Sequence, residues 1–182
     1  RQFQVFLLPM TDLILRLRKH LSPKEIMHFN TYNLSMGPYW EGVRATFEPV
    51  EGVTEESAIP DVTVWIPGVL AMSDLAKQRL EQPLAGMGEF LPVDTPDGQF
   101  WAFNCQEAVP AQTTGSDRLV ENGAVIDVFA IAFDEAPTRN QMVFKSDFDG
   151  CRATYCSQSF RKVVEDAGLA GLQFSEDLTS PF

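Results

Sequence analysis

Histidine is scarce in this chain, which has two histidines, His20 and His28, among 182 residues. Neither has a Ser, Cys or carboxylate at the spacing that Ser/His/Asp and Cys/His catalytic sites use. The phosphate loops GxGxxG and GxxxxGK[ST], the zinc motif HExxH and the esterase motif GxSxG are also missing from the sequence. Few groups that common enzyme mechanisms use are therefore present, and we predict a protein that is not an enzyme.

Cysteine and long apolar runs are equally sparse. The three cysteines, Cys105, Cys151 and Cys156, are odd in number and lack CxxC spacing, which argues against a disulfide framework and against a zinc site. We expect Cys151 and Cys156 to pack as small apolar groups, and we expect no metal or cofactor. No apolar run is long enough to span a bilayer, and the basic cluster at residues 16–19 follows the first apolar stretch, whereas a signal peptide has it before. These features predict a soluble, reduced, cytoplasmic protein.

Positive charge is rare in the middle of the chain. Residues 45–138 contain sixteen Asp and Glu against three Lys and Arg, whereas residues 1–44 contain six basic against three acidic residues, and the net charge is −11. Because an acidic surface repels phosphate groups, this balance argues against nucleic acid and against anionic membranes as ligands. It is compatible with docking to a basic protein, and also with a role in solubility alone.

The composition that remains is that of a folded domain. Hydrophobic residues make up 45% of the chain and include 14 Phe, which is enough for a sizeable core. Twelve Gly and twelve Pro favour short elements joined by turns over a helical bundle. We predict a single α+β domain with a mixed, mostly antiparallel sheet and a few short flanking helices. Residues 27–182 would form this domain, and residues 1–26 a basic helical extension, either native or added to the chain.

The region from Arg139 to Phe174 has the clearest pattern. It predicts strand, turn, strand, helix and strand in that order. Either Ser157 or Ser159 would cap the helix, and Gly168 would end it. The segments are the apolar run Met142–Phe144, the turn Asp147–Gly150, the extended run Ala153–Cys156, the helix positions Phe160, Val163, Val164 and Ala167, and the return Leu172–Phe174.

Other segments are predicted from the same signals. Ala124–Phe133 is apolar at both alternating sets of positions, which predicts a central strand covered on both faces. The Ser73-to-Phe90 spacing equals that of Ser157 to Phe174, which indicates a shared architecture of helix ends. The remaining predictions are an amphipathic helix at Asp12–Leu21 packed on the domain, strand, turn and strand at His28–Phe47, strands at Val62–Ile66, Phe90–Val93 and Phe100–Asn104, a helix at Ser73–Leu84, an exposed loop at Pro110–Ser116, and a tight turn at Glu121–Gly123.

Three passages resemble a bacterial immunity-protein family of polymorphic-toxin systems, immunity family eleven, which was formerly a domain of unknown function. Members typically end in a Ser-led helix followed by Gly-Leu-x-Gly-Leu/Phe-x-Phe, and Tyr155–Phe174 has this form. Pro67–Val93 resembles the middle of the family, with Met72-Ser-Asp-Leu opening a helix before Glu89-Phe-Leu-Pro-Val. Asp97–Asn104 matches an aromatic strand that ends in Asn. Together these passages cover roughly Val64–Phe174.

The resemblance implies a non-enzymatic function. Members hold a cognate toxin inactive by binding it, so the implied partner is a toxin protein in the same cytoplasm. If this toxin is a nuclease or another basic protein, acidic groups from the middle of the chain would occupy its substrate cleft and mimic phosphate. The sequence departs from the family after Cys105, where residues 107–116 are rich in Pro, Gln and Thr, so the resemblance assigns no role to this segment.

Candidate partner-binding residues are aromatic or acidic and lie beside turns. Tyr39 and Trp40 stand beside Pro and Gly, and Trp and Tyr are the residues that interface hot spots favour. Acidic residues beside turns would face basic groups of the partner. The full set is Tyr39, Trp40, Glu41, Glu55, Glu56, Asp94, Asp97, Asp117, Asp134 and Glu135.

Two other functions remain open from the sequence. One is a carboxylate-dependent, metal-assisted enzyme that uses Asp147 and Asp149, with Asp134 as a neighbour, because a strand followed by Asp-x-Asp-Gly holds magnesium in some phosphoryl-transfer enzymes. Only residues 151–182 follow this motif, which favours a simple turn. The other is a regulatory domain of a larger protein, which the basic N-terminal segment would fit.

Overall fold

A computed structural model describes residues 2–6, 15–18, 35–37, 40, 43–49, 58–66 and 68–179, which are called the described residues below. They form the predicted α+β fold with a mixed, mostly antiparallel sheet. The main sheet has five strands in the order β3 (Val43–Arg44), β7 (Gly88–Thr95), β8 (Gly98–Cys105), β6 (Val69–Ser73) and β5 (Val62–Ile66), and only the β3–β7 pair is parallel. A second, antiparallel sheet has the order β11 (Val143–Phe144), β12 (Thr154–Ser157), β1 (Gln2–Phe6) and β13 (Gln173–Ser175).

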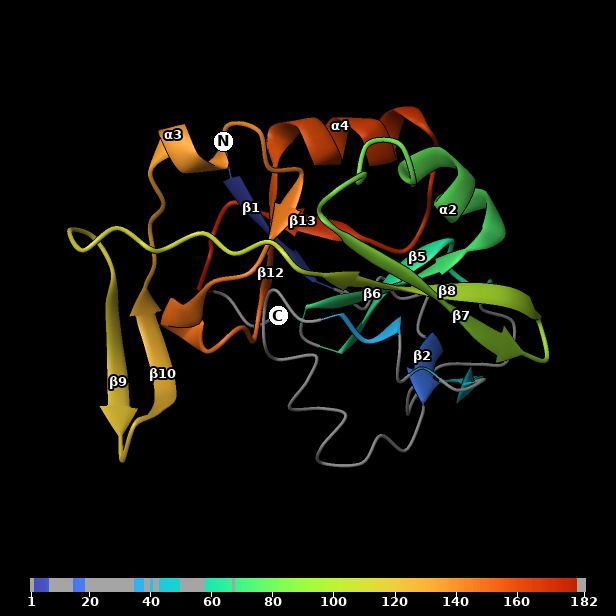
Figure 1. Cartoon of the computed structure of the whole chain (residues 1–182), viewed down its shortest axis with the longest axis horizontal. Helices are drawn as coiled ribbons and strands as arrows, with labels where there is room; N and C mark the ends of the chain where they lie inside the picture. The colour runs from blue at the N-terminus through green and yellow to red at the C-terminus, as the bar shows by residue number, and fades with distance from the viewer. Residues whose placement is uncertain are drawn as a thin grey trace.

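Two short helices cover one face of the main sheet, as Figure 1 shows. Helix α2 (Asp74–Leu80) follows β6, and helix α4 (Gln158–Asp166) follows β12. Strand alternation divides the core, since Leu70 and Phe103 pack with both helices while Ala71 and Ala102 pack on the opposite face. A third apolar cluster, built from Val109, Ile131, Phe133, Phe144 and Tyr155, lies outside these two layers.

Both predicted helix starts and the predicted stop at Gly168 are confirmed, but the helix predicted over Ser73–Leu84 is too long. Helix α2 ends at Leu80, shortly before Pro83, which has no backbone N–H to continue the helical hydrogen bonds. Ser73 Oγ accepts a hydrogen bond from Ala76 N at 3.2 Å, and Ser157 Oγ accepts one from Phe160 N at 3.4 Å, so Ser157 and not Ser159 caps α4. At the other end of α4, Gly168 N donates to Glu165 O and Leu169 N donates to Val164 O, which is a Schellman motif.

The two strand–helix–strand units also share a topology. In each unit the strands before and after the helix are separated in their sheet by a third, antiparallel strand: β8 lies between β6 and β7, and β1 lies between β12 and β13. The equal Ser-to-Phe spacing therefore reflects a common architecture.

The predicted N-terminal helix is wrong over residues 15–18. These residues form strand β2 (Leu15–Arg18), which pairs antiparallel with β4 (Thr46–Pro49). Leu and Arg alternate here with a period of two, which is the strand period, and pairing with β4 supplies the backbone hydrogen bonds. Gln2–Phe6 is likewise a strand inside the second sheet. The predicted domain boundary at residue 26 and most of the predicted strand–turn–strand at 28–47 lie outside the described residues.

The predicted central strand at Ala124–Phe133 is also wrong. Only Ala124–Ala130 is a strand, β10, and it pairs with β9 (Asp117–Glu121) in a two-stranded ribbon. The predicted tight turn joins them, with Asn122 at φ 51° and Gly123 at φ 80°, a conformation that favours Asn-Gly. Beyond β10 the chain enters the third cluster, where Ile131 and Phe133 are buried. Residues 117–130 are called the arm below; Figure 1 shows it extending from one end of the molecule.

Candidate protein-interaction surface

The arm exposes apolar side chains that a folded protein usually buries. Six large apolar side chains are well exposed in the described part of the chain, and four of them lie in the arm. Their exposed fractions are 40% for Leu119, 44% for Val120, 50% for Ile126 and 58% for Phe129. Several large apolar side chains exposed on one short element indicate a surface that binds another protein.

One face of the arm is fixed to the rest of the protein. The Arg118 guanidinium donates to the backbone carbonyls of Asp147, at 3.1 Å, and Phe148, at 2.5 Å, and it lies 4.5 Å from the centre of the Phe148 ring. Arg152 donates to the carbonyl of Val125. These contacts join the arm to the short 3-10 helix η2 (Asp147–Asp149) and the residues after it. The arm is therefore attached along this face, from Arg118 near its start to Val125 beside its turn.

The outward face of β9 combines acidic and apolar groups. Because side chains alternate along a strand, Arg118 on the attached face places Asp117, Leu119 and Glu121 together on the opposite face. All five residues of β9 are exposed. On β10, Asp127 is paired with Leu119 in the ladder and adds a third carboxylate near it. The arm thus offers an apolar side chain between acidic ones.

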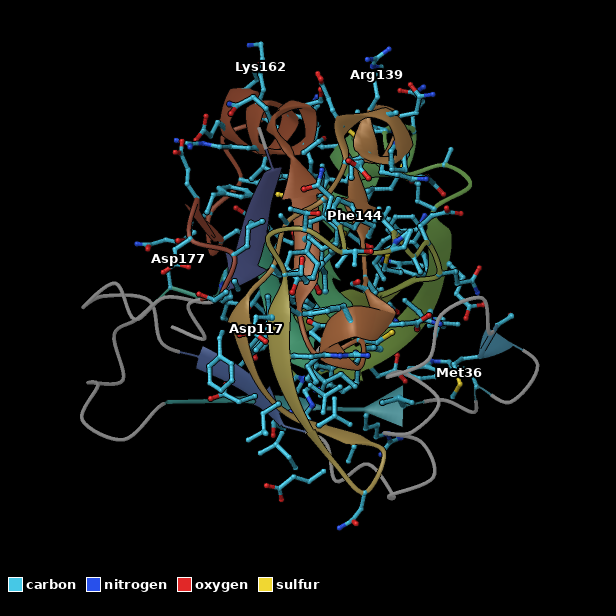
Figure 2. All side chains as sticks on the ribbon, turned by 90° about the vertical axis from the view of Figure 1, so that its left-hand side faces the viewer. Met36, Asp117, Arg139, Phe144, Lys162 and Asp177 are labelled. Atoms are coloured by element: carbon cyan, nitrogen blue, oxygen red, sulfur yellow. The ribbon has the colours of Figure 1, made fainter. Side chains whose placement is uncertain are left out.

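The outer edge of β9 has no strand partner among the described residues and is called the open edge below. The ladder partner of β9 is β10, and no hydrogen bond between the described residues reaches the backbone of residues 117–121 from outside the arm. Figure 1 places β9 at the outermost end of the molecule, with β10 between it and the main body. Figure 2 looks at this end directly and shows Asp117 on the ribbon that faces the viewer. An open strand edge is a place where another chain can add a strand.

Irregular pairing between β9 and β10 explains why the exposure of side chains on β10 was not predicted from the sequence. The register shifts between Val125 and Asp127, and again between Val128 and Ala130. Ile126 and Phe129 are the extra residues at these two bulges, and a bulge interrupts the strict alternation of faces. A signal against a central strand was present nonetheless. The Asn-Gly turn pairs β10 with a strand in which Asp117, Arg118 and Glu121 are charged.

Three of the predicted partner-binding residues lie at or near the arm. Asp117 is the first residue of β9. Asp134 is the N-cap residue of α3 (Glu135–Thr138), its carboxylate accepts a hydrogen bond from Gln112 Nε2, and the exposed Glu135 opens that helix. Figure 1 shows α3 at the same end of the molecule as the arm.

The other described candidates are elsewhere. Asp94 and Asp97 lie at the turn between β7 and β8, which Figure 1 shows at the opposite end of the molecule from β9. Trp40 is half-buried, packs on the core cluster that contains Val93, and donates from its indole nitrogen to the carbonyl of Pro92 at 2.7 Å. The structure therefore does not bring these three together with the arm. Tyr39, Glu41, Glu55 and Glu56, and both histidines, lie outside the described residues.

The Asp147–Gly150 motif forms the predicted turn, and its two carboxylates have different surroundings. Asp147 is exposed, whereas Asp149 is buried and accepts hydrogen bonds at 2.9 Å from Tyr155 Oη and from Ala153 N. Burial raises the pKa of the Asp149 carboxyl above its ordinary value, and these hydrogen bonds act in the opposite direction. Asp149 thus ties the turn to β12. No group of three His, Cys, Asp or Glu side chains is arranged to hold a metal ion in the part of the chain that the structure describes.

The three cysteines and Lys145, which is fully buried, lie beside this turn and the main sheet. Cys105, Cys151 and Cys156 are buried as free thiols. Burial raises the pKa of Cys105 to about 11 and that of Cys151 to about 12, so neither is a thiolate at neutral pH. Burial lowers the pKa of Lys145, whose Nζ lies 3.5 Å from Asn104 Oδ1. The predicted apolar packing is confirmed for Cys156, which lies in the cluster with Leu70 and Phe103, whereas the buried Cys151 thiol donates to Asp147 Oδ1 at 3.8 Å.

Comparison with known proteins adds no assignment. No protein-family model matches the sequence, and no curated protein matches it either. Within the described ranges, no helix is both long enough and apolar enough to cross a membrane. The functional proposal is therefore based on the arm.

Proposed function

We propose that the chain is a cytoplasmic immunity protein that binds a cognate bacterial toxin through the arm and keeps the toxin inactive. The observation that carries the binding function is the exposure of Leu119, Val120, Ile126 and Phe129 on one projecting ribbon. Large apolar groups near the centre of an interface, surrounded by polar ones, supply most of the binding energy in protein complexes. The toxin as partner rests on the resemblance of Val64–Phe174 to the immunity family.

The charge of the arm indicates the kind of toxin it would hold. The arm carries Asp117, Glu121 and Asp127, and its one basic side chain, Arg118, already binds backbone carbonyls of the turn. A basic toxin surface would complement these carboxylates and associate faster with them. A nuclease has such a surface where it binds phosphates, and acidic groups placed there would exclude its substrate.

A rescue experiment tests this proposal. The protein encoded next to this chain is expressed in a naive bacterium with and without it, and complex formation is followed by size exclusion. The double variant Leu119→Ser with Phe129→Ser removes the two apolar groups on adjacent strands. Leu75→Ser is the matched control, because Leu75 is 48% exposed on α2, away from the arm.

We expect the wild type and Leu75→Ser to rescue growth and form a stable complex. Each serine substitution in the arm is expected to cost about 1–2 kcal/mol of binding, so the double variant should bind at least roughly thirtyfold more weakly and fail to rescue. Rescue by the double variant at wild-type level would contradict a role for the arm.

A further inference from the structure

The open edge of β9 adds a specific mode of binding to the exposed side chains. A strand at the edge of a sheet presents backbone N–H and C=O groups that a second chain can pair with, and side chains on alternate positions then set the specificity. Residues 117–121 have this edge free of hydrogen bonds from the rest of the described chain, and all five are exposed. The arm is fixed from behind by Arg118 and Arg152, so an incoming strand would meet a positioned edge.

The side-chain order along β9 defines what the incoming strand must carry. Asp117, Leu119 and Glu121 lie on one face at alternate positions, acidic, apolar and acidic. Across an antiparallel or parallel pair, opposite charges directly facing each other stabilise the pairing and like charges oppose it. The complementary strand therefore has a basic, an apolar and a basic residue at alternate positions.

We propose that β9 binds an extended segment of its partner protein as a third strand of the arm, and that this segment has the pattern basic-x-apolar-x-basic. The inference rests on the proposed function, because it names the structural element by which the toxin would be held. It also explains the composition of β9. Carboxylates at its two ends admit a basic strand and discourage pairing with others.

A second copy of this chain is a poor occupant of the same edge. If two β9 strands paired antiparallel about Leu119, Asp117 of each would face Glu121 of the other, which makes two acidic pairs. Parallel pairing in register would place Asp against Asp and Glu against Glu. Both arrangements set like charges opposite each other, so the edge selects a different, basic chain.

Synthetic peptides test the proposal directly. The probe is a short peptide with Lys, Leu and Lys at alternate positions and Thr between them, and its binding to the whole protein is followed by the NMR shifts of backbone amides. A matched peptide replaces both Lys by Glu. Two further versions of the Lys peptide are N-methylated at alternate residues, so that each version blocks one of its two edges.

We expect the Lys peptide to shift the amides of residues 117–121 and to bind at least about tenfold more tightly than the Glu peptide. One N-methylated version should lose binding, because its blocked edge is the one that pairs with β9. Equal binding by both N-methylated versions and the unmodified peptide, or no shift of the β9 amides, would overturn strand addition.

A charge-exchanged variant gives a result that loss of folding could not produce, because it predicts a reversed preference and not a loss of binding. In Asp117→Lys with Glu121→Lys the order of affinities should reverse, so that the Glu peptide binds more tightly than the Lys peptide. Asp94→Lys with Asp97→Lys changes the net charge equally at the other end of the molecule and should leave the order unchanged. The same change of preference in both variants would mean that net charge decides binding, and would overturn the pairing.

The two proposals fail in different ways. If the serine variants of Leu119 and Phe129 abolish toxin rescue while the peptides show no pairing, the arm binds through its apolar face and strand addition is wrong. If the peptides pair with β9 as expected but rescue does not depend on the arm, the edge is a binding site and the proposed immunity function of the arm is wrong.

Discussion

Among single residues, the Glu89 carboxylate is the clearest example of a side chain that fixes a loop. It accepts hydrogen bonds from Ser35 Oγ at 2.7 Å, Met36 N at 2.5 Å, Gly37 N at 3.2 Å and Asn104 Nδ2 at 3.0 Å. Burial acts to raise the pKa of Glu89, but these four donors outweigh it and hold the pKa below its ordinary value. The charged form of Glu89 therefore stabilises the contact between residues 35–37 and the main sheet.

Replacing Glu89 should make this contribution measurable. Glu89→Gln replaces one of the two acceptor oxygens by an NH2 group, which is a donor. We expect this substitution to lower the free energy of unfolding by about 1–2 kcal/mol at pH 7. Glu81→Gln, which removes an exposed pair with Lys77, is the control and should change stability by less than about 0.5 kcal/mol.

The pH dependence follows from the direction of the shift. Since the pKa of Glu89 is lower in the folded state, its stabilisation is complete above the unfolded value of 4.5 and is lost as the pH falls through the folded pKa. Urea titrations at several pH values should therefore show the gap between wild type and Glu89→Gln narrowing below about pH 4.5. A gap that stays constant down to pH 3 would contradict this account.

Position 68 requires glycine for two reasons, its positive φ and its close contact with a neighbouring side chain. It has φ of 78°, and a Cβ there would lie 2.2 Å from Lys145 Cε, a side chain that is fully buried and cannot move aside into solvent. Gly86 has almost the same φ, 81°, with nothing within 4 Å of an added Cβ. The comparison of the two alanine variants thus separates backbone strain from steric overlap.

We expect Gly86→Ala to cost about 1 kcal/mol through its positive φ, and Gly68→Ala to cost about 1–3 kcal/mol more because the core around Lys145 is overpacked. Chemical denaturation of both variants measures the difference. Equal costs would show that Lys145 relaxes without penalty.

At the scale of elements, the arm and the turn at η2 act as one unit. Arg118 links them with two hydrogen bonds and by stacking over the Phe148 ring. In Arg118→Ala we expect the amides of residues 117–130 to exchange at least about tenfold faster with solvent, while those of α4 keep their protection. Unchanged exchange in the arm would show that the ladder between β9 and β10 positions it alone.

The helices and their caps were accessible from the sequence because local signals determine them. Ser73, Ser157 and Gly168 act through hydrogen bonds within a few residues, and the Asn122-Gly123 turn requires a positive φ that those residues adopt easily. Whether the side chains of β10 are buried or exposed depends instead on which strands pair with it. Its apolar residues have the composition of a buried strand, and only the two bulges and the lack of neighbouring strands in the described chain expose Ile126 and Phe129.

The N-terminal strands illustrate the same limit. Leu15–Arg18 alternates with a period of two, as a strand does, yet within the window Asp12–Leu21 the apolar residues also fit one face of a helix. Pairing with β4, which is distant in the sequence, decides in favour of the strand. Strand β1 depends even more on distant sequence, since its partners are β12 and β13 near the other end of the chain. Long-range pairing of this kind leaves no mark in a local pattern.

For the whole molecule, the acidic middle of the sequence does not become one acidic face. The chain folds so that the β7–β8 turn with Asp94 and Asp97 and the arm with Asp117, Glu121 and Asp127 lie at opposite ends (Figure 1). Asp117 was a candidate because it is acidic and lies beside a predicted turn, but Asp94 and Asp97 met the same criterion, so the sequence could not separate the two ends. It also could not find Leu119 and Phe129, because their exposure is a property of the assembled fold.

The most direct test of the central claim is hydrogen exchange of this chain with and without the toxin that we propose it neutralises. If the arm holds the toxin by strand pairing, the amides of residues 117–121 should exchange at least about tenfold more slowly in the complex, and the β7–β8 turn should be unaffected. Protection confined to other parts of the molecule, with the arm exchanging as in the free protein, would contradict the account.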